Sequence, residues 1–251
     1  MGTEEKEKIE NAPDPAEHSR FFRWLDNYWY HYKWHTIIAL FAIVTLAICL
    51  AQCSSRETYD LTVTFAGPRI LNPTEQDGIG SALETAMPED FDGNGVKVVQ
   101  LVTYGLYSEE ELFRAYSSES ADGTRVTDDL AYSTARKQNI DEGNAFSTFV
   151  KTGECAVWLV SPYVYEQYGL SALAVPLAET FGNAIPEGAA DDYAVRLKDT
   201  AFYTAYGAVR ELPEDTLILL TRPVVYGKVS KKAVYARYEA MYRALLLFDG
   251  E

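Results

Sequence analysis

Histidine is missing from most of this sequence. The chain has 251 residues, and its three histidines all come before residue 36: His18, His31 and His35. The part after residue 53 therefore holds no Ser-His-Asp or Cys-His catalytic set and no histidine-based zinc site. Its acidic pairs, such as Asp128 with Asp129, occur in polar runs, where carboxylates are commonly solvated or lie at helix starts. We expect no catalytic residue, no metal and no cofactor, and hence a protein that is not an enzyme.

Cysteine and positive charge are scarce as well. The three cysteines are Cys49, Cys53 and Cys155, so no disulfide can form within the chain after residue 53. The apolar surroundings of Cys155, "ECAVWLV", predict a buried thiol. Residues 54–251 carry 17 Lys+Arg against 30 Asp+Glu, a net charge of −13. Such an acidic domain repels phosphate backbones, so we expect no nucleic-acid partner.

One long apolar run is present near the N-terminus. Thr36 to Cys53 comprises 18 residues without a formal charge, which is about the length of a membrane span. Aromatic side chains, which favour the headgroup level of a bilayer, come just before it: Trp24, Tyr28, Trp29, Tyr30, Tyr32 and Trp34. We expect an aromatic juxtamembrane helix over residues 16–35 and a transmembrane helix over residues 36–53, with the lipid bilayer as the partner of Thr36 to Cys53.

The charges beside this run predict its orientation. Arg20, Arg23 and Lys33 precede it closely, and positive charge favours the cytoplasmic side. The predicted localisation is the cell membrane, as a single-pass protein with a cytoplasmic N-terminus and an extracellular C-terminal domain. Two alternatives stay open: a lipoprotein modified at Cys53, and a cleaved signal peptide, although 35 residues with seven acids are unusual before the apolar part of such a peptide.

The remaining segments follow from composition and periodicity. Residues 1–15 are charged and proline-interrupted and are expected to form a disordered cytoplasmic tail. Residues 54–58 form a polar tether, and 59–251 the extracellular domain. Within it, period-two or apolar runs predict strands at 59–67, 95–104, 155–160, 172–178, 193–207 and 215–223. Helices are expected at 74–87, with Thr74 as cap, and at 108–118, 141–153, 161–169 and 231–248, with a loop over 119–140.

The alternation of strands and helices is typical of an α/β fold. We expect a mainly parallel sheet with flanking helices, preceded by one transmembrane helix. Short polar signals predict several helix ends: Ser108 and Glu111 fit a capping box, and Ser161 followed by Pro162 fits a helix start. Gly153 is expected to end the helix at 141–153.

One turn resembles the beginning of a calcium-binding loop, with matching residues Asp90, Asp92, Asn94 and Gly95. A complete loop of this kind needs oxygen ligands near its ninth and twelfth positions. Counted from Asp90, these positions are Val98 and Leu101, which are apolar. We therefore favour a turn that Asp and Asn side chains brace over an incomplete ion site, and we predict no metal ligand.

Three motifs resemble one family when taken in order: "LTVTFAG", "KTGECAVWLVSPYVYEQYG" and "LPEDTLILLTRP". They resemble extracellular solute-binding proteins of the type 2 periplasmic-binding class. The lead "NYWYHYKWHT" is similar to that of small membrane-anchored proteins of Gram-positive bacteria. The resemblance covers about residues 58–248 and implies a ligand held by loops after strands. Because about 190 residues are few for two full lobes, a reduced periplasmic-binding-like fold is expected.

The loops that follow the strands are the expected binding region, since parallel strands present their carboxyl ends at one edge of a sheet. Arg69 could pair with a ligand carboxylate, and Ser161 starts a helix that could bind an anion. Tyrosine rings suit sugars, peptides or proteins, although they could equally fill strand and helix faces. The predicted ligand-binding residues are Arg69, Tyr104, Tyr107, Ser161, Tyr163 and Tyr165.

Two functions are compatible with these features. The first is a non-catalytic binding module anchored at the cell surface, whose partner is a small solute or a membrane protein. The alternative is a structural or regulatory subunit of a membrane protein complex, which would contact its partners through residues 16–53 and hold no small-molecule ligand.

Overall fold

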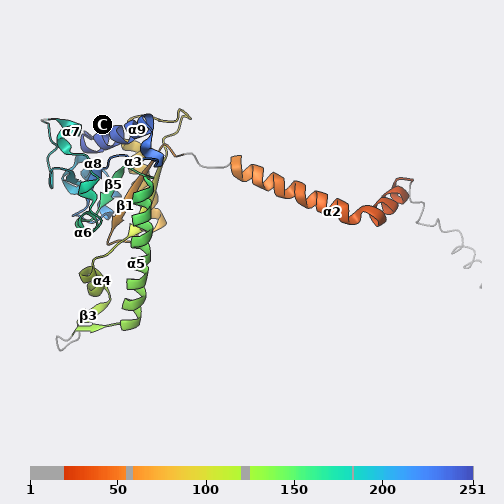
Figure 1. Cartoon of the computed structure of the whole chain (residues 1–251), viewed down its shortest axis with the longest axis horizontal. Helices are drawn as coiled ribbons and strands as arrows, with labels where there is room; N and C mark the ends of the chain where they lie inside the picture. The colour runs from red at the N-terminus through yellow and green to blue at the C-terminus, as the bar shows by residue number, and fades with distance from the viewer. Residues whose placement is uncertain (1–19, 55–58, 120–124, 183, 251) are drawn as a thin grey trace, which may run out of the picture. The chain divides into compact units, whose positions relative to one another are not determined.

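The computed structural model describes residues 20–54, 59–119, 125–182 and 184–250 (Figure 1). The chain divides into two compact units, Met1–Glu57 and Thr58–Glu251. The predicted disordered tail lies outside the described residues, as do residues 55–58 of the predicted tether.

The first unit contains helix α2, Arg20–Ser54. Its segment Asn27–Leu50 is long and apolar enough to cross a membrane, and it is the one such helix among the described residues. The rings of Trp24, Tyr28 and Tyr32 stack in succession, with centroids 5.6 and 5.3 Å apart, because residues four apart lie on one face of a helix. Residues 20–35 of the predicted juxtamembrane segment and the predicted transmembrane segment 36–53 belong to one continuous helix, whereas residues 16–19 lie outside the described residues.

The second unit is built on one five-stranded sheet. Its strands are β1 (Leu61–Gly67), β2 (Val99–Gly105), β5 (Val157–Val160), β6 (Ala194–Arg196) and β7 (Leu217–Leu220), in the spatial order β2-β1-β5-β7-β6. β1 pairs in parallel with β2 and β5, whereas β7 runs antiparallel to β5 and β6. The expected α/β class is confirmed, and the sheet is mainly but not purely parallel.

Helices and a small hairpin complete the second unit. They are α3 (Pro73–Ala86), α4 (Glu109–Ala115), the hairpin of β3 (Ser117–Glu119) and β4 (Arg125–Thr127), α5 (Asp129–Thr152), α6 (Pro162–Gln167), α7 (Leu177–Phe181), α8 (Ala201–Ala205) and α9 (Lys232–Leu246), with short 3₁₀ turns at Leu170–Ala172, Leu197–Asp199, Val209–Glu211 and Lys228–Ser230. The capping box of Ser108 and Glu111 and the cap at Ser161 are confirmed. The predicted cap Thr74 is wrong: Asn72 caps α3, because Pro73 fills its first turn.

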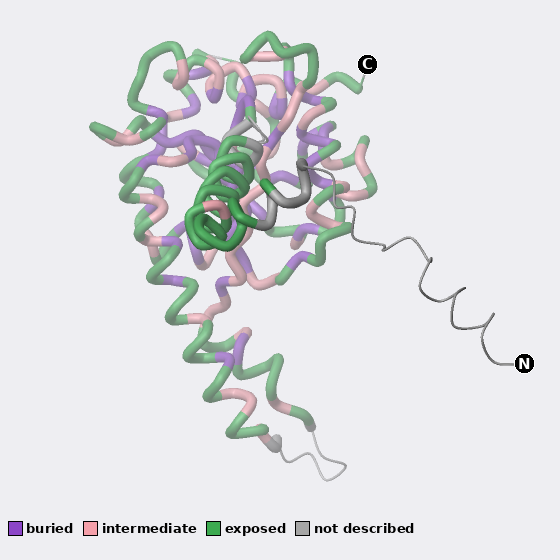
Figure 2. Tube along the Cα trace, turned by 90° about the vertical axis from the view of Figure 1, so that its right-hand side faces the viewer, coloured by how far each residue is buried: buried purple, intermediate pink, exposed green. Residues whose placement is uncertain are grey.

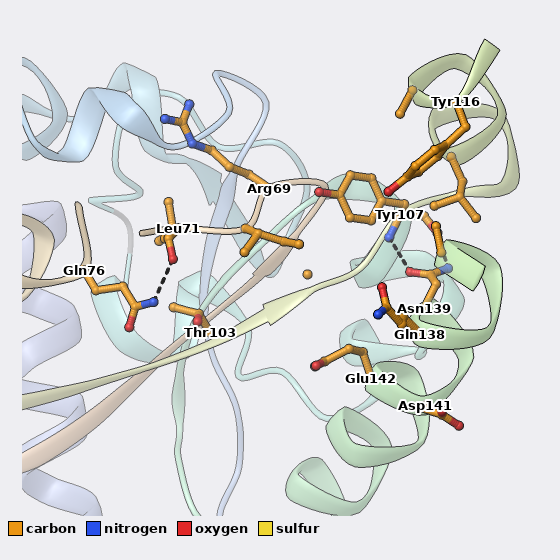
Figure 3. A pocket seen from close by; sticks show the side chains of 15 residues that line it. Arg69, Leu71, Gln76, Thr103, Tyr107, Tyr116, Gln138, Asn139, Asp141 and Glu142 are labelled. Carbon is orange, nitrogen blue, oxygen red and sulfur yellow. Dashed lines mark hydrogen bonds between the residues drawn. The ribbon is translucent and has the colours of Figure 1, made fainter. Parts of the chain in front are cut away.

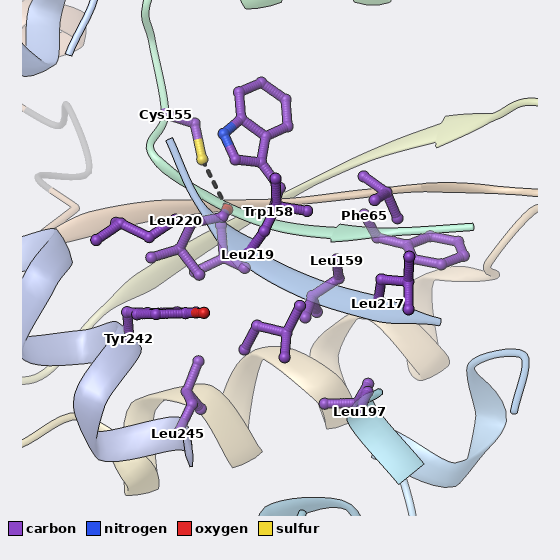
Figure 4. Close-up of a cluster of buried hydrophobic side chains, with 14 of the residues drawn as sticks. Phe65, Cys155, Trp158, Leu159, Leu197, Leu217, Leu219, Leu220, Tyr242 and Leu245 are labelled. Carbon is purple, nitrogen blue, oxygen red and sulfur yellow. Dashed lines mark hydrogen bonds between the residues drawn. The ribbon is translucent and has the colours of Figure 1, made fainter. Parts of the chain in front are cut away.

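The core lies on both faces of β5 and β7 (Figure 4). Trp158 faces α5 and contacts Phe146 with a ring-centroid distance of 5.7 Å, whereas its neighbour Leu159 points to the opposite face. Cys155 is buried, and burial raises the pKa of its thiol to about 12, so the predicted buried thiol is confirmed. All described core residues lie between Leu61 and Leu246, and the second unit therefore has a core of its own.

Three segments differ from the sequence predictions. The loop expected over 119–140 is wrong, because α5 already begins at Asp129 with Asp128 as its cap. The strand expected over 193–207 shortens to β6, and α8 follows it. The strand expected over 172–178 is a single bridge, after which α7 begins. The helical start of α5 was missed because its apolar pattern is weak: in the first half of α5, Ala135 is the residue that is buried.

The first half of α5 projects beyond the sheet together with α4 and the β3–β4 hairpin (Figures 1 and 2). We call this projection the arm; it comprises α4, β3, β4 and residues 129–140. Glu109 joins the two helices of the arm: it accepts hydrogen bonds from Arg136 Nε at 3.0 Å and from the Tyr132 hydroxyl at 3.1 Å. These contacts lower the pKa of the Glu109 carboxyl, with the Arg136 hydrogen bond as the main cause.

Candidate functional site

A pocket of about 480 Å³ lies where β1 and β2 end (Figure 3). The parallel register sets Gly67 opposite Gly105, so both strands end at the same level and the loops that follow them lie side by side. The loops after β1 and β2 form one wall, and α4 and α5 form the other. At Gly105 a Cβ atom would lie 3.0 Å from Ile70 Cγ1, so glycine allows the two loops to approach closely.

Arg69 lies in the first loop and is held by two carboxylates. Its Nη2 donates to Glu75 Oε1 at 2.9 Å and to Glu211 Oε2 at 2.7 Å. The hydrogen bond to Glu75 is the main cause that raises the pKa of Arg69. A ligand carboxylate would have to compete with both acids. Arg69 thus ties the pocket wall to α3 and to the turn at Val209–Glu211.

Tyr107 lies in the second loop and is fixed to α5. Its backbone N–H donates to Asn139 Oδ1 at 2.9 Å, and Asn139 Nδ2 donates to the Tyr107 carbonyl at 2.9 Å. Burial raises the pKa of the Tyr107 hydroxyl. Tyr116 lies beside it on the rim of the pocket (Figure 3). The two hydrogen bonds to Asn139 therefore fix the backbone of Tyr107 at the pocket mouth.

Two acids on α5 have different positions at the pocket. Asp141 points away and accepts from Lys137 Nζ at 2.7 Å, whereas the Glu142 side chain is directed toward the cavity (Figure 3). Within the described part of the chain, no ion pair engages Glu142. Gln138 lies one turn earlier and adds an amide to the same wall. The pocket therefore combines aromatic and amide groups with one unpaired carboxylate.

The structure brings together Arg69 and Tyr107 and places the other predicted site residues elsewhere. Tyr104 packs against Phe146 with a centroid distance of 5.3 Å. Ser161 is buried, and its hydroxyl accepts the Val164 N–H to cap α6, so it is already engaged. Tyr163 packs against the core.

Tyr165 has a role in holding a loop. Its hydroxyl donates to Asp191 Oδ2 at 2.8 Å, and burial, together with that hydrogen bond, raises its pKa. Asp191 Oδ1 in turn accepts the backbone N–H groups of Tyr193 and Ala194. Tyr165 thus fixes the segment that leads into β6, away from the pocket.

Sequence reasoning missed the residues that α5 and the end of α4 contribute: Tyr116, Gln138, Asn139 and Glu142. Gln138 and Asn139 lie in the segment predicted as a loop, whereas Tyr116 and Glu142 lie in helices that were predicted but not assigned to a site. One signal was available, because Asp128 followed by a charged first turn is typical of a helix start. Gln138 and Glu142 are four residues apart, and in a helix that begins at residue 129 they lie on the same face.

The calcium-like turn lies at the opposite edge of the sheet, before β2. The carboxylates of Asp60, Asp90 and Asp92 come within 4.8 Å of one another, a grouping that could hold a cation. However, Asp90 accepts the N–H groups of Gly93 and Gly95 at 2.8 and 2.6 Å, and Asp60 accepts further backbone donors. The predicted side-chain bracing of this turn is confirmed.

Comparison of the chain with protein-family models gave no match. Comparisons with curated proteins and with solved structures gave none either. The geometry of the pocket is thus the basis on which a function can be proposed.

Proposed function

We propose that this chain is a membrane-anchored, non-catalytic binding protein that takes a small polar solute into the pocket at the ends of β1 and β2. The observation that carries this proposal is the pocket of about 480 Å³ itself. It has the size of a small-molecule site, and ligands of α/β proteins commonly bind beyond the carboxyl ends of strands. A relationship to solute-binding proteins of the type 2 periplasmic-binding class is part of the proposal.

The lining favours hydroxyl or amino groups over a carboxylate. The guanidinium of Arg69 already bonds two acids, and Glu142 adds negative charge without an ion pair among the described residues. The Glu142 carboxylate is exposed and can accept charge-assisted hydrogen bonds from ligand hydroxyl or amino groups. The rings of Tyr107 and Tyr116 supply apolar faces for stacking. A neutral or cationic solute with hydroxyl or amino groups fits this combination.

Anchoring through α2 completes the proposal. The apolar side chains of Asn27–Leu50 are exposed in the structure, and a lipid environment would cover them. The positive charges before the span support a cytoplasmic N-terminus and an extracellular second unit. A cleaved signal sequence shares the same features, so intact mass measurement of the mature protein and protease treatment of whole cells are the deciding tests.

A thermal-shift screen tests the solute. The fragment 58–251 is heated with pools of sugars, amino acids, amines and short peptides. A solute at about 100 times its Kd should stabilise the fold by about 2.7 kcal/mol, or raise Tm by roughly 5–10 °C. Glu142→Gln and Tyr107→Ala should reduce this shift strongly.

Matched variants serve as controls for the screen. Glu187→Gln alters an exposed acid and Tyr203→Ala a half-buried tyrosine, both outside the pocket. They should leave the shift unchanged once each variant's own Tm is subtracted. If no pool raises Tm, or if the control pair removes the shift as strongly as the pocket pair does, the pocket proposal is wrong.

A second candidate function is a regulatory or structural subunit of a membrane complex. It is supported by the stacked rings of Trp24, Tyr28 and Tyr32 along α2, which offer a rigid aromatic face to a partner helix. Replacement of residues 20–54 by an unrelated span should then abolish co-purification of partners. Retention of the same partners would contradict this candidate.

A further inference from the structure

The segment Arg222–Tyr238 stands out by its charge. It carries five cations and no acidic residue, in a part of the chain whose net charge is −13. The segment follows β7, which runs antiparallel to β5. Because β5 is parallel to β1, β7 ends at the edge of the sheet where β1 begins. The basic segment therefore lies at the amino edge, opposite to the pocket.

Tyr226 at the tip of this segment is unusual in backbone and in exposure. Its φ is 68°, the one positive value among the described non-glycine residues. Its side chain is 99% exposed, and that of its neighbour Val225 is 75% exposed. A left-handed backbone is unfavourable for residues with a Cβ atom, and tyrosine gains no buried contact here in return. Such an outlier supports a hypothesis of function.

The lysines after the tip are only partly neutralised. Lys228 forms an ion pair with Glu154, whereas no ion pair of Lys231 or Lys232 occurs in the described part of the chain. Both are exposed at the start of α9. On the side of α9 away from Tyr226, Glu89 and Asp90 share a hollow with Ala233 and Arg237. These two acids confine the basic surface to the side of α9 that carries Tyr226.

The same edge carries the beginning of the second unit. Tyr59, its first described residue, lines one surface hollow together with Lys228 and Val229. Four residues, 55–58, separate Tyr59 from Ser54 at the end of α2. A chain of that length spans at most about 18 Å, at about 3.6 Å per residue. The chain that leaves α2 therefore enters the second unit at its amino edge, through a short connection.

We propose that Val225, Tyr226, Lys228, Lys231 and Lys232 form a lipid-docking loop that binds anionic phospholipid headgroups. Each lysine near an anionic surface raises the constant for membrane binding about fivefold. Tyrosine rings favour the headgroup level of a bilayer. Docking at the amino edge turns the pocket at the carboxyl edge toward the aqueous phase. This inference rests on the proposed anchoring through α2.

Labelling of an engineered cysteine in the full chain tests the docking. Val225→Cys leaves Tyr226 and the lysines in place, and Leu130→Cys on the arm is the control, because Leu130 is also exposed. Each protein is placed in nanodiscs of phosphatidylcholine alone or with phosphatidylserine, and reaction with a neutral maleimide is followed by mass spectrometry. We expect labelling at position 225 to be at least fivefold slower with phosphatidylserine and to recover at high salt, while position 130 does not change.

A matched pair of charge reversals tests the lysines. With Lys231→Glu and Lys232→Glu combined, position 225 should be labelled as fast with phosphatidylserine as with phosphatidylcholine alone. Arg114→Glu with Lys137→Glu makes the same change of net charge on the arm, at exposed ion pairs, and should leave the slow labelling at position 225 unchanged. Equal labelling of position 225 in both lipids would overturn the proposal, and so would protection that survives the lysine reversal.

The failure of docking can be separated from the failure of anchoring. The fragment 58–251, which contains the whole described core, is attached by an N-terminal histidine tag to vesicles with nickel-chelating lipid. Slow labelling of this tethered fragment on anionic vesicles supports the docking loop even where the full chain does not insert. Equal labelling on neutral and anionic vesicles overturns it, even where α2 proves to be an anchor.

Discussion

Asp60 ties the start of β1 to the turn before β2, and its replacement is the sharpest test of how this edge is held. The residue is 7% exposed. Its Oδ1 accepts the backbone N–H groups of Phe91 and Asp92 at 2.9 Å each, and its Oδ2 accepts that of Val98 at 3.0 Å. Asp60→Ala would leave three backbone donors without this acceptor in a partly buried setting.

The expected loss follows from these three hydrogen bonds. Bonds to a charged group contribute about 1.5–3 kcal/mol each, and an unpaired buried donor costs about 1–3 kcal/mol, but contributions at one carboxylate are not additive. Water can reach the exposed Asp92, so we expect Asp60→Ala to lower the free energy of unfolding by about 3–4 kcal/mol. Asp60→Asn keeps one oxygen for two donors but sets an NH₂ group against Val98, and should cost about 2 kcal/mol.

Urea unfolding of fragment 58–251 measures this difference. In thermal unfolding of the same fragment, Asp60→Ala should lower Tm by roughly 6–16 °C for a domain of this size. Asp77→Ala, at an exposed position of α3, is the control and should change stability by less than about 0.5 kcal/mol. If Asp60→Ala costs less than about 1 kcal/mol with an unchanged m value, the buried carboxylate does not hold this edge and the reasoning is refuted.

Three further predictions concern the backbone and pH. Gly153→Ala should destabilise the fold by about 2 kcal/mol in urea unfolding, because φ is 61° and the new Cβ would lie 2.9 Å from Val224 Cβ. The hydrogen bond from the Gly95 N–H is the main cause that lowers the pKa of Asp90 in the folded protein. The stability that ionised Asp90 contributes is therefore present above its unfolded-state pKa and is lost as the pH falls through its folded-state pKa. Asp90→Asn should remove this acid-side loss when Tm is measured over a pH series. Tyr226→Gly should leave stability unchanged or raise it by up to about 1 kcal/mol, since glycine tolerates positive φ; a clear loss of Tm would show that this tyrosine serves the fold.

Features that depend on few neighbouring residues could be predicted from the sequence. The capping box of Ser108 and Glu111, the start of α6 at Ser161 and the end of α5 at Gly153 are all local hydrogen-bond or φ requirements, and all are confirmed. The part of the Asp90 turn that Asp90, Asp92 and Asn94 brace belongs to the same class, since these acceptors lie within five residues of their donors. Local chemistry is readable because both partners are adjacent in the chain.

The candidate site was only half predictable for a physical reason. Arg69 and Tyr107 follow strands, and the rule that parallel strands end at one edge brings them together. The other wall comes from α5, whose first half projects as part of the arm and buries little. A helix that packs few side chains shows no strong apolar period, so Gln138 was placed in a predicted loop although Asp128 offered a local signal for a helix start.

The direction of β7 matters most for the proposed function, and no periodicity reveals it. A buried strand reads the same whether it runs parallel or antiparallel to its neighbour. Had β7 run parallel to β5, the loop after it would lie beside the pocket. Because it runs antiparallel, the segment after it lies at the amino edge, where Lys228 lines a hollow together with Tyr59. The reversal of one strand thus places the candidate pocket and the proposed lipid-docking loop at opposite edges of the sheet, so the two proposals can be tested independently.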